Sequence, residues 1–328
     1  MKELNIRKND SGQRIDRFLK KYLSKAPNSF IYKMLRKKNI KLNHKKATPD
    51  TIIHEGDTIQ LYLADETIEK FREKEKVEKS LLDLNVIYED DNIILINKPA
   101  GLLSHSVDKD YGKNIVDALV YYLYKKGEYN PRFEKTFKPA ICNRLDRNTS
   151  GIIIGAKNYE ALRVINQAIK NRYINRYYKT IVKGDVKKDG RIKGFLSKDV
   201  ELNRVEISQS KKDDSKEIET YIRVIKSSGQ YTLLEVELIT GRTHQIRAHL
   251  ADIGHPIVGD VKYGDKKTNR YFKDKFGLHN QLLHSYRIVI DQIDQPLDYL
   301  RGKEFTAEVN RKFVEIEREL FNHKEKGR

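Results

Sequence analysis

The chain has 328 residues and carries 65 lysines and arginines against 47 acidic residues, a formal net charge of +18. This length predicts about two domains, each able to bury its own core, and the charge indicates a polyanionic partner, most often nucleic acid and less often an anionic membrane. No run approaches the roughly 18 apolar residues of a membrane span, and the first residues lack the apolar segment of a signal peptide. Cys142 is the sole cysteine, which excludes an intrachain disulfide and predicts a reducing, cytoplasmic setting.

The basic surplus is concentrated at the start of the chain. Residues 1–63 hold 15 lysines and arginines against 6 acidic residues, which is half of the net charge. Apolar residues spaced three and four positions apart predict a first helix: Ile15, Phe18, Leu19, Tyr22 and Leu23. A second helix follows, and its outer side is basic: Lys33, Arg36, Lys37 and Lys38. Short strands are predicted at 40–43 and 57–63.

The next segment, residues 64–80, is charged, poor in apolar residues and free of glycine and proline. Such a composition is typical of an exposed linker. The spacing of its Glu and Lys residues favours at most a transient helix. We therefore expect an N-terminal domain at 1–63, a charged linker at 64–82 and a second domain at 83–328.

The second domain alternates strands and helices irregularly, which favours an α+β fold over a regular βαβ series. Strands are predicted at 85–90, 92–97, 151–157, 177–184, 217–225, 231–239 and 283–290. Helices are predicted at 114–126, 158–170 and 243–253.

Common cofactor motifs are missing from the sequence. It contains no G-x-x-x-x-G-K-[ST] and no G-x-G-x-x-G after a strand, so no nucleotide or dinucleotide loop is predicted. Cys142 stands alone, so it has no neighbouring cysteine with which to bind zinc. His244 and His249 lie on one predicted helix, but they are five residues apart and therefore do not share a face. We therefore expect neither a metal site nor a cofactor.

The densest polar cluster is Asn143–Gly151, between a short apolar run and a predicted strand. Arg144 and Arg147 flank Asp146, and nearby positive charge favours an ionised carboxylate. The turn-forming residues behind it leave Asp146 at a strand end, where functional side chains often lie. A structural turn with Asp–Arg pairs is the alternative interpretation of the residues alone.

Two further segments carry candidate functional residues. Residues 240–247 join a long strand to a helix, and Arg242 and Arg247 would flank the helix N-terminus, where anions bind; a helix cap with solvated arginines is the alternative. In the strand that begins near Arg176, Tyr178 and Thr180 share one face. Tyr178 could present a flat ring to a base, although core packing is the commoner outcome.

Taken together, these segments resemble the RluA-type pseudouridine synthases. Asn143–Gly151 is similar to their H-R-L-D-x-x-T-S-G motif, and residues 240–260 are similar to G-R-[ST]-H-Q-[IL]-R followed by G-H-P-[IL]-x-G-D. Shorter matches occur in the family's order: Lys98–Leu102, Arg176–Gly184 and Gln281–His284. Residues 1–63 resemble an S4 domain, and this arrangement is that of the RluC- and RluD-type enzymes of large-subunit ribosomal RNA.

The resemblance implies a small α/β S4 RNA-binding domain followed by a catalytic domain with a mixed, mainly antiparallel sheet flanked by helices. It also implies isomerisation of uridine to pseudouridine in 23S ribosomal RNA, without a cofactor or cosubstrate. The sequence leaves the oligomeric state open, and a monomer is the default expectation. The implied catalytic residues are Asp146, Tyr178 and Arg247. Asp146 would attack ribose C1′ or assist a glycal route, Arg247 would pair with it, and Tyr178 would stack on the uracil and is a candidate to accept the C5 proton.

The remaining site residues implied by the resemblance fall into two groups. Substrate contacts are expected from Arg144, Arg147, Arg242, His244, Gln245 and Leu283. RNA contacts in the S4 domain are expected from Arg14, Lys33, Arg36, Lys37, Lys38 and Asn43.

The sequence departs from the family pattern at four positions. Asn143 replaces the leading histidine and Asn280 replaces an arginine, which puts the choice of target in doubt more than the activity. Lys38 and His44 replace glycines common in S4 domains. Two alternatives stay open: the same reaction on tRNA, or a non-catalytic RNA-binding factor of ribosome assembly.

Overall fold

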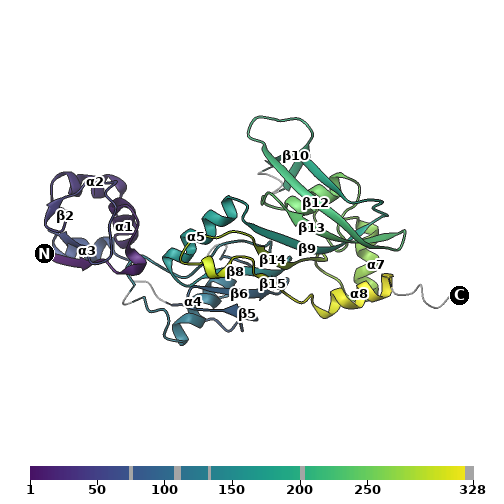
Figure 1. The fold of residues 1–328 in the computed structure, drawn as a ribbon, viewed down its shortest axis with the longest axis horizontal. Helices are drawn as coiled ribbons and strands as arrows, with labels where there is room; N and C mark the ends of the chain where they lie inside the picture. The colour runs from purple at the N-terminus through teal and green to yellow at the C-terminus, as the bar shows by residue number, and fades with distance from the viewer. Residues whose placement is uncertain (74–76, 107–111, 132–133, 200–203, 322–328) are drawn as a thin grey trace.

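The structure is a computed structural model that describes the chain except for residues 74–76, 107–111, 132–133, 200–203 and 322–328. It contains an N-terminal unit, residues 1–72, and a C-terminal unit, residues 80–321, each with its own sheet. Figure 1 shows the N-terminal unit at one end of the molecule and helices α7 (Lys266–Phe276) and α8 (Arg311–Phe321) at the other.

The N-terminal unit is a small sheet with helices packed on it. Its strand order is β1 (Lys2–Asn5), β4 (Thr58–Leu61), β2 (Ile40–Leu42) and β3 (Lys45–Lys46). Helices α1 (Ile15–Tyr22) and α2 (Asn28–Arg36) bury their apolar faces in one core with it. The predicted stripe on the first helix is confirmed, since Ile15, Phe18 and Leu19 are fully buried.

The segment predicted as an exposed linker begins with a packed helix, α3 (Asp65–Phe71). Ile68 is 1% exposed within the N-terminal core, and the ring of Phe71 lies 4.7 Å from that of Phe30. Two apolar residues among many charges are a weak sequence signal, yet they are enough to place the helix against the core. Residues 74–76 of the predicted linker lie outside the described residues.

The C-terminal unit is built on a mixed, mainly antiparallel sheet, as expected. The strand order is β11 (Arg204–Ser208), β10 (Gly190–Asp199), β12 (Lys216–Ser227), β13 (Tyr231–Leu238), β9 (Ile174–Lys183), β14 (Leu283–Ile290), β8 (Ser150–Ala156), β6 (Ile93–Lys98) and β5 (Val86–Glu89). Two short strands lie off this path: β7 (Ala140–Ile141) pairs with β8, and β15 (Glu304–Thr306) pairs with β14. Strands β10 and β11 and helices α7 and α8 were not among the predicted elements.

Helices cover both faces of this sheet, which explains the unbroken apolar run of β6. Ile94 and Ile96 belong to the core shared with α4 (Ile115–Lys125) and α6 (Gln245–Asp252). Ile93 and Leu95 alternate with them and join the opposite core, which contains α5 (Tyr159–Lys170). Helices α7 and α8 form a further core of the same unit with residues of β9 and β13. Among the described helices, none combines the length and apolarity that crossing a membrane requires.

The centre of the sheet holds a close parallel contact between β8 and β14. Ser285 of β14 pairs with Gly151 of β8, while β14 runs antiparallel to β9 on its other side. Gly151 has φ +114°, and a Cβ there would lie 2.2 Å from the carbonyl oxygen of Ser285. Only glycine allows these strands to approach so closely, and the residues just before Gly151 are thereby held beside β14 and β9.

Polar side chains join the two units. The Thr136 hydroxyl donates to the Asp10 carboxylate (2.7 Å) and accepts from the amide of Gln13 (3.2 Å). Lys135 donates to the carbonyl oxygen of Asn5 (2.6 Å). Asp10 is 1% exposed and Gln13 3% exposed, so the contacts of Thr136 are partly shielded from solvent, whereas that of Lys135 is exposed.

The end of α2 generates a test of backbone strain. Lys38 follows the helix at φ 62°, and the N–H of Asn39 bonds the carbonyl of Met34 (3.0 Å), a helix end at which glycine is favoured. We predict that Lys38→Gly raises the stability of the N-terminal unit by about 0.5–1 kcal/mol, because it relieves the left-handed conformation. Amide hydrogen exchange of α2 in the full chain measures the change.

Lys37→Gly is the matched control, since Lys37 is also an exposed lysine but has φ −76°. It removes the same charge and should lower protection of α2, because glycine only adds freedom to the unfolded chain there. Equal effects of the two substitutions would contradict the strain at Lys38.

Candidate active site

A hollow lies above the centre of the sheet, where the chain before β8 meets β9, β14 and the start of α6. It is lined by Arg144, Leu145, Asp146, Thr149, Tyr178, Leu238, Arg242, His244, Gln245, Ile246, Arg247 and Leu283. The sequence motifs at 143–151 and 240–247, about a hundred residues apart, therefore meet at one site.

A chain of charged groups forms the polar side of the hollow. Arg247 donates from Nη1 to Oδ2 of Asp146 (2.8 Å). The same guanidinium binds Asp260 through two hydrogen bonds, Nε to Oδ2 (2.7 Å) and Nη2 to Oδ1 (2.9 Å). Asp260 is fully buried and Arg247 is 8% exposed, whereas the side chain of Asp146 is 26% exposed. Asp146 is thus the most exposed member of the chain, and it lines the hollow together with Arg247.

The buried members of this chain stay charged. Burial opposes the charge on Arg247, but Asp260 and Asp146 outweigh it and raise the pKa of the guanidinium. Burial likewise opposes ionisation of Asp260, but Arg247 and the backbone N–H groups of Tyr263 and Lys262 lower its pKa. Because two carboxylates share one guanidinium, its orientation is fixed and one N–H is aimed at Asp146.

The loop that carries Asp146 is pinned by the chain after β6. Lys98 is fully buried, and its ammonium donates to the carbonyl oxygens of Leu102 (2.7 Å), Arg147 (2.9 Å) and Pro99 (3.0 Å). Burial lowers the pKa of Lys98 to about 7, while Asp146 opposes the shift; three carbonyls matched to three N–H donors also favour the charged form. Ser104 donates to the carbonyl oxygen of Leu145 (2.8 Å), so the loop is tied on both sides of Asp146.

The opposite side of the hollow is apolar. Tyr178 is 4% exposed, and Leu283 and Ile246 are buried beside it in the same core. The predicted alternation along β9 is confirmed, because Tyr178 and Thr180 are buried while Tyr177 is half-buried on the other face. Burial raises the pKa of Tyr178, so its phenol keeps its proton near neutral pH.

The structure brings together Asp146, Tyr178, Arg247 and Leu283 as the sequence predicted, with Arg144 and Arg242 exposed at the rim. Arg147 does not line the hollow, because its Nε donates to the carbonyl oxygen of Gly101 (3.1 Å). The ion-pair partner of Asp146 is therefore Arg247 from α6 rather than either neighbouring arginine. Arg247 lies in the first turn of α6, as predicted, but it is buried rather than solvated.

Two predicted substrate contacts are also engaged with the protein. Gln245 accepts from the Thr240 hydroxyl (2.9 Å) and the Arg242 N–H (3.1 Å), and it donates to Thr220 and to the carbonyl of Glu219 (both 3.0 Å). These bonds shape the turn that presents Arg242. His244 has its Nε2 3.8 Å from Asp146 Oδ2 and its Nδ1 3.0 Å from the Tyr263 hydroxyl.

Some of the predicted RNA contacts of the N-terminal unit are exposed at the surface, and others bond the protein itself. Lys33, Arg36, Lys37 and Lys38 are exposed on and just after α2. Arg14 pairs with Asp16 through two hydrogen bonds of 3.1 and 3.2 Å. Asn43 donates to Asp57 (2.7 Å) and accepts from the N–H of Thr58 (2.9 Å), which secures the turn between β2 and β3.

The two departures from the family pattern in the C-terminal unit lie outside the hollow. Asn143 is 7% exposed and bonds the backbone of Ile152 (3.1 Å) and Ile154 (2.8 Å), across the turn that contains Asp146. Asn280 lies against Gly259 and does not line the hollow. Asn143 thus maintains the turn rather than facing a ligand.

Sequence reasoning missed three residues that organise the site. Asp260 and Lys98 stand in the quoted motifs without a role, and Tyr263 follows Asp260 by three residues. A carboxylate directly after the apolar run Ile257–Gly259, and a lysine ending the apolar run of β6, are signals of buried, paired charges.

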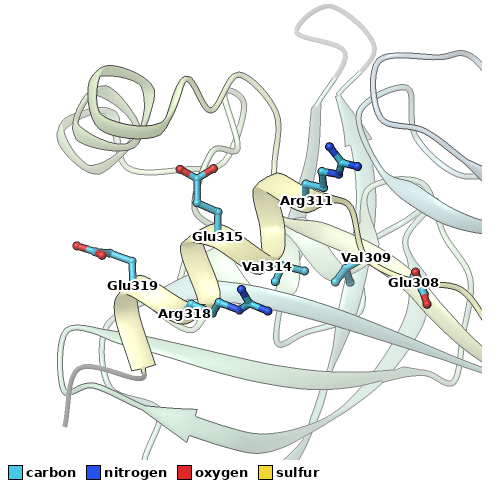
Figure 2. A pocket seen from close by; sticks show the side chains of 7 residues that line it. All are labelled: Glu308, Val309, Arg311, Val314, Glu315, Arg318 and Glu319. Carbon is cyan, nitrogen blue, oxygen red and sulfur yellow. The ribbon is translucent and has the colours of Figure 1, made fainter. Parts of the chain in front are cut away.

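A second hollow lies along α8, as Figure 2 shows, and is lined by Glu308, Val309, Arg311, Val314, Glu315, Arg318 and Glu319. It shares no residue with the hollow around Asp146. In Figure 2 the side chains of Arg311, Glu315 and Glu319 project from the helix without converging on one point. Within the part of the chain that the structure describes, no three His, Cys, Asp or Glu side chains are grouped to hold a metal ion.

The arrangement around Asp146 has a definite chemical capacity. The carboxylate of Asp146 faces the hollow, which is a slot walled by the ring of Tyr178 and by aliphatic side chains, and arginines lie at its rim. Such a slot accepts a planar ring attached to an anionic backbone, with the carboxylate available as a nucleophile or base.

Comparison with known proteins agrees with this geometry. The sequence model described as RNA pseudouridylate synthase matches residues 92–252. An uncharacterized RNA pseudouridine synthase of Mycoplasma capricolum is 31% identical over 309 residues, covering 92% of this chain and 96% of that protein. The ribosomal large subunit pseudouridine synthase C of Vibrio vulnificus is 32% identical, covering 90% of each chain.

A second group of relatives gives the same result. The ribosomal large subunit pseudouridine synthase D of Borreliella burgdorferi is 37% identical over 237 residues, covering 72% of this chain and 68% of that protein. Among solved structures, human RNA pseudouridylate synthase domain containing 4 superposes with a TM-score of 0.56 at 21% identity. It covers 72% of this chain and 92% of the human chain, and it supports the fold.

The Lys98 tether generates a stability prediction. Lys98→Met should lower the free energy of unfolding by about 2–4 kcal/mol, because it leaves three carbonyl oxygens without their shared donor. Lys183→Met is the matched control: its ammonium pairs with Asp265 (3.2 Å) at 47% exposure, and its loss should cost less than about 1 kcal/mol. Urea denaturation measures both, and equal losses would contradict the tether.

Proposed function

The chain belongs to the RluA-type RNA pseudouridine synthases, which isomerise uridine in RNA, and we propose that its substrate is large-subunit ribosomal RNA, 23S RNA in particular. The observation that carries the proposal is the Asp260–Arg247–Asp146 chain, which presents one ionised carboxylate to a slot with an aromatic wall. Relatives similar over most of the chain are named for the ribosomal large subunit.

The reaction needs only groups that this chain supplies. The N1–C1′ bond breaks, the uracil turns, and a C5–C1′ bond forms; C5 loses its proton and N1 gains one. We assign the essential role to Asp146, which attacks C1′ or assists a glycal route. Arg247 aims this carboxylate, and the pair is partly shielded from water, which strengthens their interaction.

The walls of the slot hold the base. Tyr178 stacks on the uracil and Leu283 packs on it from another side. Because the raised pKa of Tyr178 keeps the phenol protonated, stacking is favoured over proton acceptance as its contribution. Arg144 and Arg242 at the rim bind backbone phosphates, which positions the RNA without reading its sequence. The target uridine must leave its stack to enter, at a cost of a few kcal/mol.

The N-terminal unit supplies affinity. We propose that it is an S4-like RNA-binding domain ending near residue 72, with the exposed cations of α2 on RNA phosphates. Such contacts are largely independent of sequence and weaken with salt. The large-subunit proposal is further supported by this arrangement of a basic unit ahead of the catalytic fold.

The direct test follows tritium release from RNA transcribed with [5-³H]uridine. The wild-type protein should release tritium from 23S RNA without added metal or nucleotide, and not from a tRNA pool. Asp146→Asn should abolish release while keeping RNA affinity within about twofold, because the substitution removes the carboxylate but not the phosphate contacts. Filter binding measures the affinity.

The control is Asp252→Asn, an exposed carboxylate at the end of α6 that should leave the rate unchanged. Release from tRNA alone would keep the chemistry and overturn the substrate. No release from either RNA by folded wild-type protein would favour the non-catalytic assembly factor.

A second prediction concerns the basic helix. Replacing Lys33, Arg36 and Lys37 together by Gln should weaken RNA binding and reduce the slope of log affinity against log salt by about 2–3, since each phosphate contact contributes roughly one unit. Replacing Lys266, Lys267 and Arg270, three exposed cations of α7, removes the same charge as a control. Equal changes in both variants would show a non-specific charge effect and refute the role of α2.

A further inference from the structure

Tyr263 lies between the β10–β11 hairpin and the start of α6, next to the Asp146 site. Its hydroxyl oxygen accepts the backbone N–H of Val205 in β11 (3.0 Å) and lies 3.0 Å from Nδ1 of His244. A phenol has one proton to donate. Because Val205 is the donor in one contact, the phenol proton is available to the imidazole nitrogen in the other.

This contact determines where the imidazole carries its proton. If Nδ1 accepts from Tyr263, a neutral imidazole holds its proton on Nε2. That atom lies 3.8 Å from Oδ2 of Asp146. An N–H directed at a carboxylate attracts it, whereas the other tautomer would direct a lone pair at the same oxygen and repel it.

We propose that Tyr263 is a positioning residue that holds His244 in the Nε2–H tautomer, so that the imidazole presents a donor to Asp146 and to the bound nucleotide. This inference rests on the proposed function, in which Asp146 is the catalytic carboxylate. The hydroxyl of Tyr263 acts through His244 and does not touch the reacting atoms.

The surroundings of His244 favour the neutral imidazole that this role requires. Burial lowers the pKa of His244, and the charged groups that face it divide by sign: Arg247 and Lys262 lower the pKa further, while Asp146 and Asp260 raise it. The net direction is downward, so the ring is neutral near pH 7 and has one proton to place.

The ring of Tyr263 is itself held by the charged chain of the site. Its backbone N–H donates to Asp260 (3.0 Å), and its face lies 5.2 Å from the guanidinium carbon of Arg247. It meets the His244 ring edge-on at 5.6 Å. Tyr263 therefore contacts both Arg247 and His244, the side chains that face Asp146. Of these two, its hydroxyl contacts His244.

The first test reads the tautomer directly. Side-chain ¹⁵N–¹H correlation spectra of ¹⁵N-histidine-labelled full-length protein are compared for the wild type, His244→Gln and Tyr263→Phe. The signal lost in His244→Gln identifies His244 among the nine histidines. We expect the Nε2–H pattern in the wild type and a shift toward mixed tautomers in Tyr263→Phe. An Nδ1–H pattern in the wild type, or no change in Tyr263→Phe, would overturn the proposal.

The second test is a double-mutant cycle on the rate. Tyr263→Phe keeps the ring and should lower kcat about tenfold, with KM changed less than about twofold, as for loss of one polar contact. In the His244→Gln background the same change should cost less than about twofold, because an amide N–H has no tautomer to fix. Additive losses would show that Tyr263 only supports the fold and would refute the inference.

The two tests separate this inference from the proposed function. If wild-type protein releases no tritium from any RNA, the proposed function fails, while the spectra still decide the tautomer. If the wild type is active and the spectra show no dependence on Tyr263, the inference fails and the proposed function stands.

Discussion

The buried contact between Arg247 and Asp260 is the interaction on which the site depends. Asp260 is fully buried and accepts two hydrogen bonds from Arg247 and two from backbone N–H groups, so it leaves the guanidinium a single orientation. Only then does Nη1 point at Asp146. Such a buried pair adds little net stability compared with apolar packing, but losing one partner leaves an uncompensated charge and costs about 3–5 kcal/mol. The pair matters here for geometry, because buried Asp260 orients Arg247, and Arg247 in turn orients the more exposed carboxylate of Asp146.

The backbone around the site is constrained in the same manner. The loop of Asp146 could adopt many conformations, but Lys98 holds the carbonyl oxygen of Arg147 on one side, and Gly151 brings the following strand against β14 on the other. Leu283 begins β14, so the close approach that only glycine permits also places the apolar wall beside the carboxylate. The position of Asp146 therefore depends on residues whose side chains never meet a ligand.

Apolar content distinguishes several predicted elements from helix α7, which the sequence analysis missed. Strand β6 and helices α4 and α5 carry enough apolar residues to be recognised, whereas α7 buries only Thr268, Phe272 and Phe276 among charged residues. At the site, the motif resemblance predicted the pairing of Asp146 with Arg247. It could not show that Arg147 and Gln245 bond the protein itself, because partners such as the carbonyl oxygens of Gly101 and Glu219 are brought close only by folding. Tyr263 was missed for the same reason.

The geometry also separates the sources of affinity and chemistry. Extracting a base from its stack costs a few kcal/mol, and stacking on one aromatic side chain returns about 1–3 kcal/mol. The slot offers the phenol ring of Tyr178 for stacking, beside the aliphatic side chains of Leu283 and Ile246, so under the proposed function the flipped base alone gains little net binding energy. The remaining binding energy must come from contacts with RNA phosphates, which are numerous only where exposed cations gather. Under the proposed function, the exposed basic face of α2 meets that need, and a pocket that binds its base weakly leaves the choice among uridines to the RNA around the target.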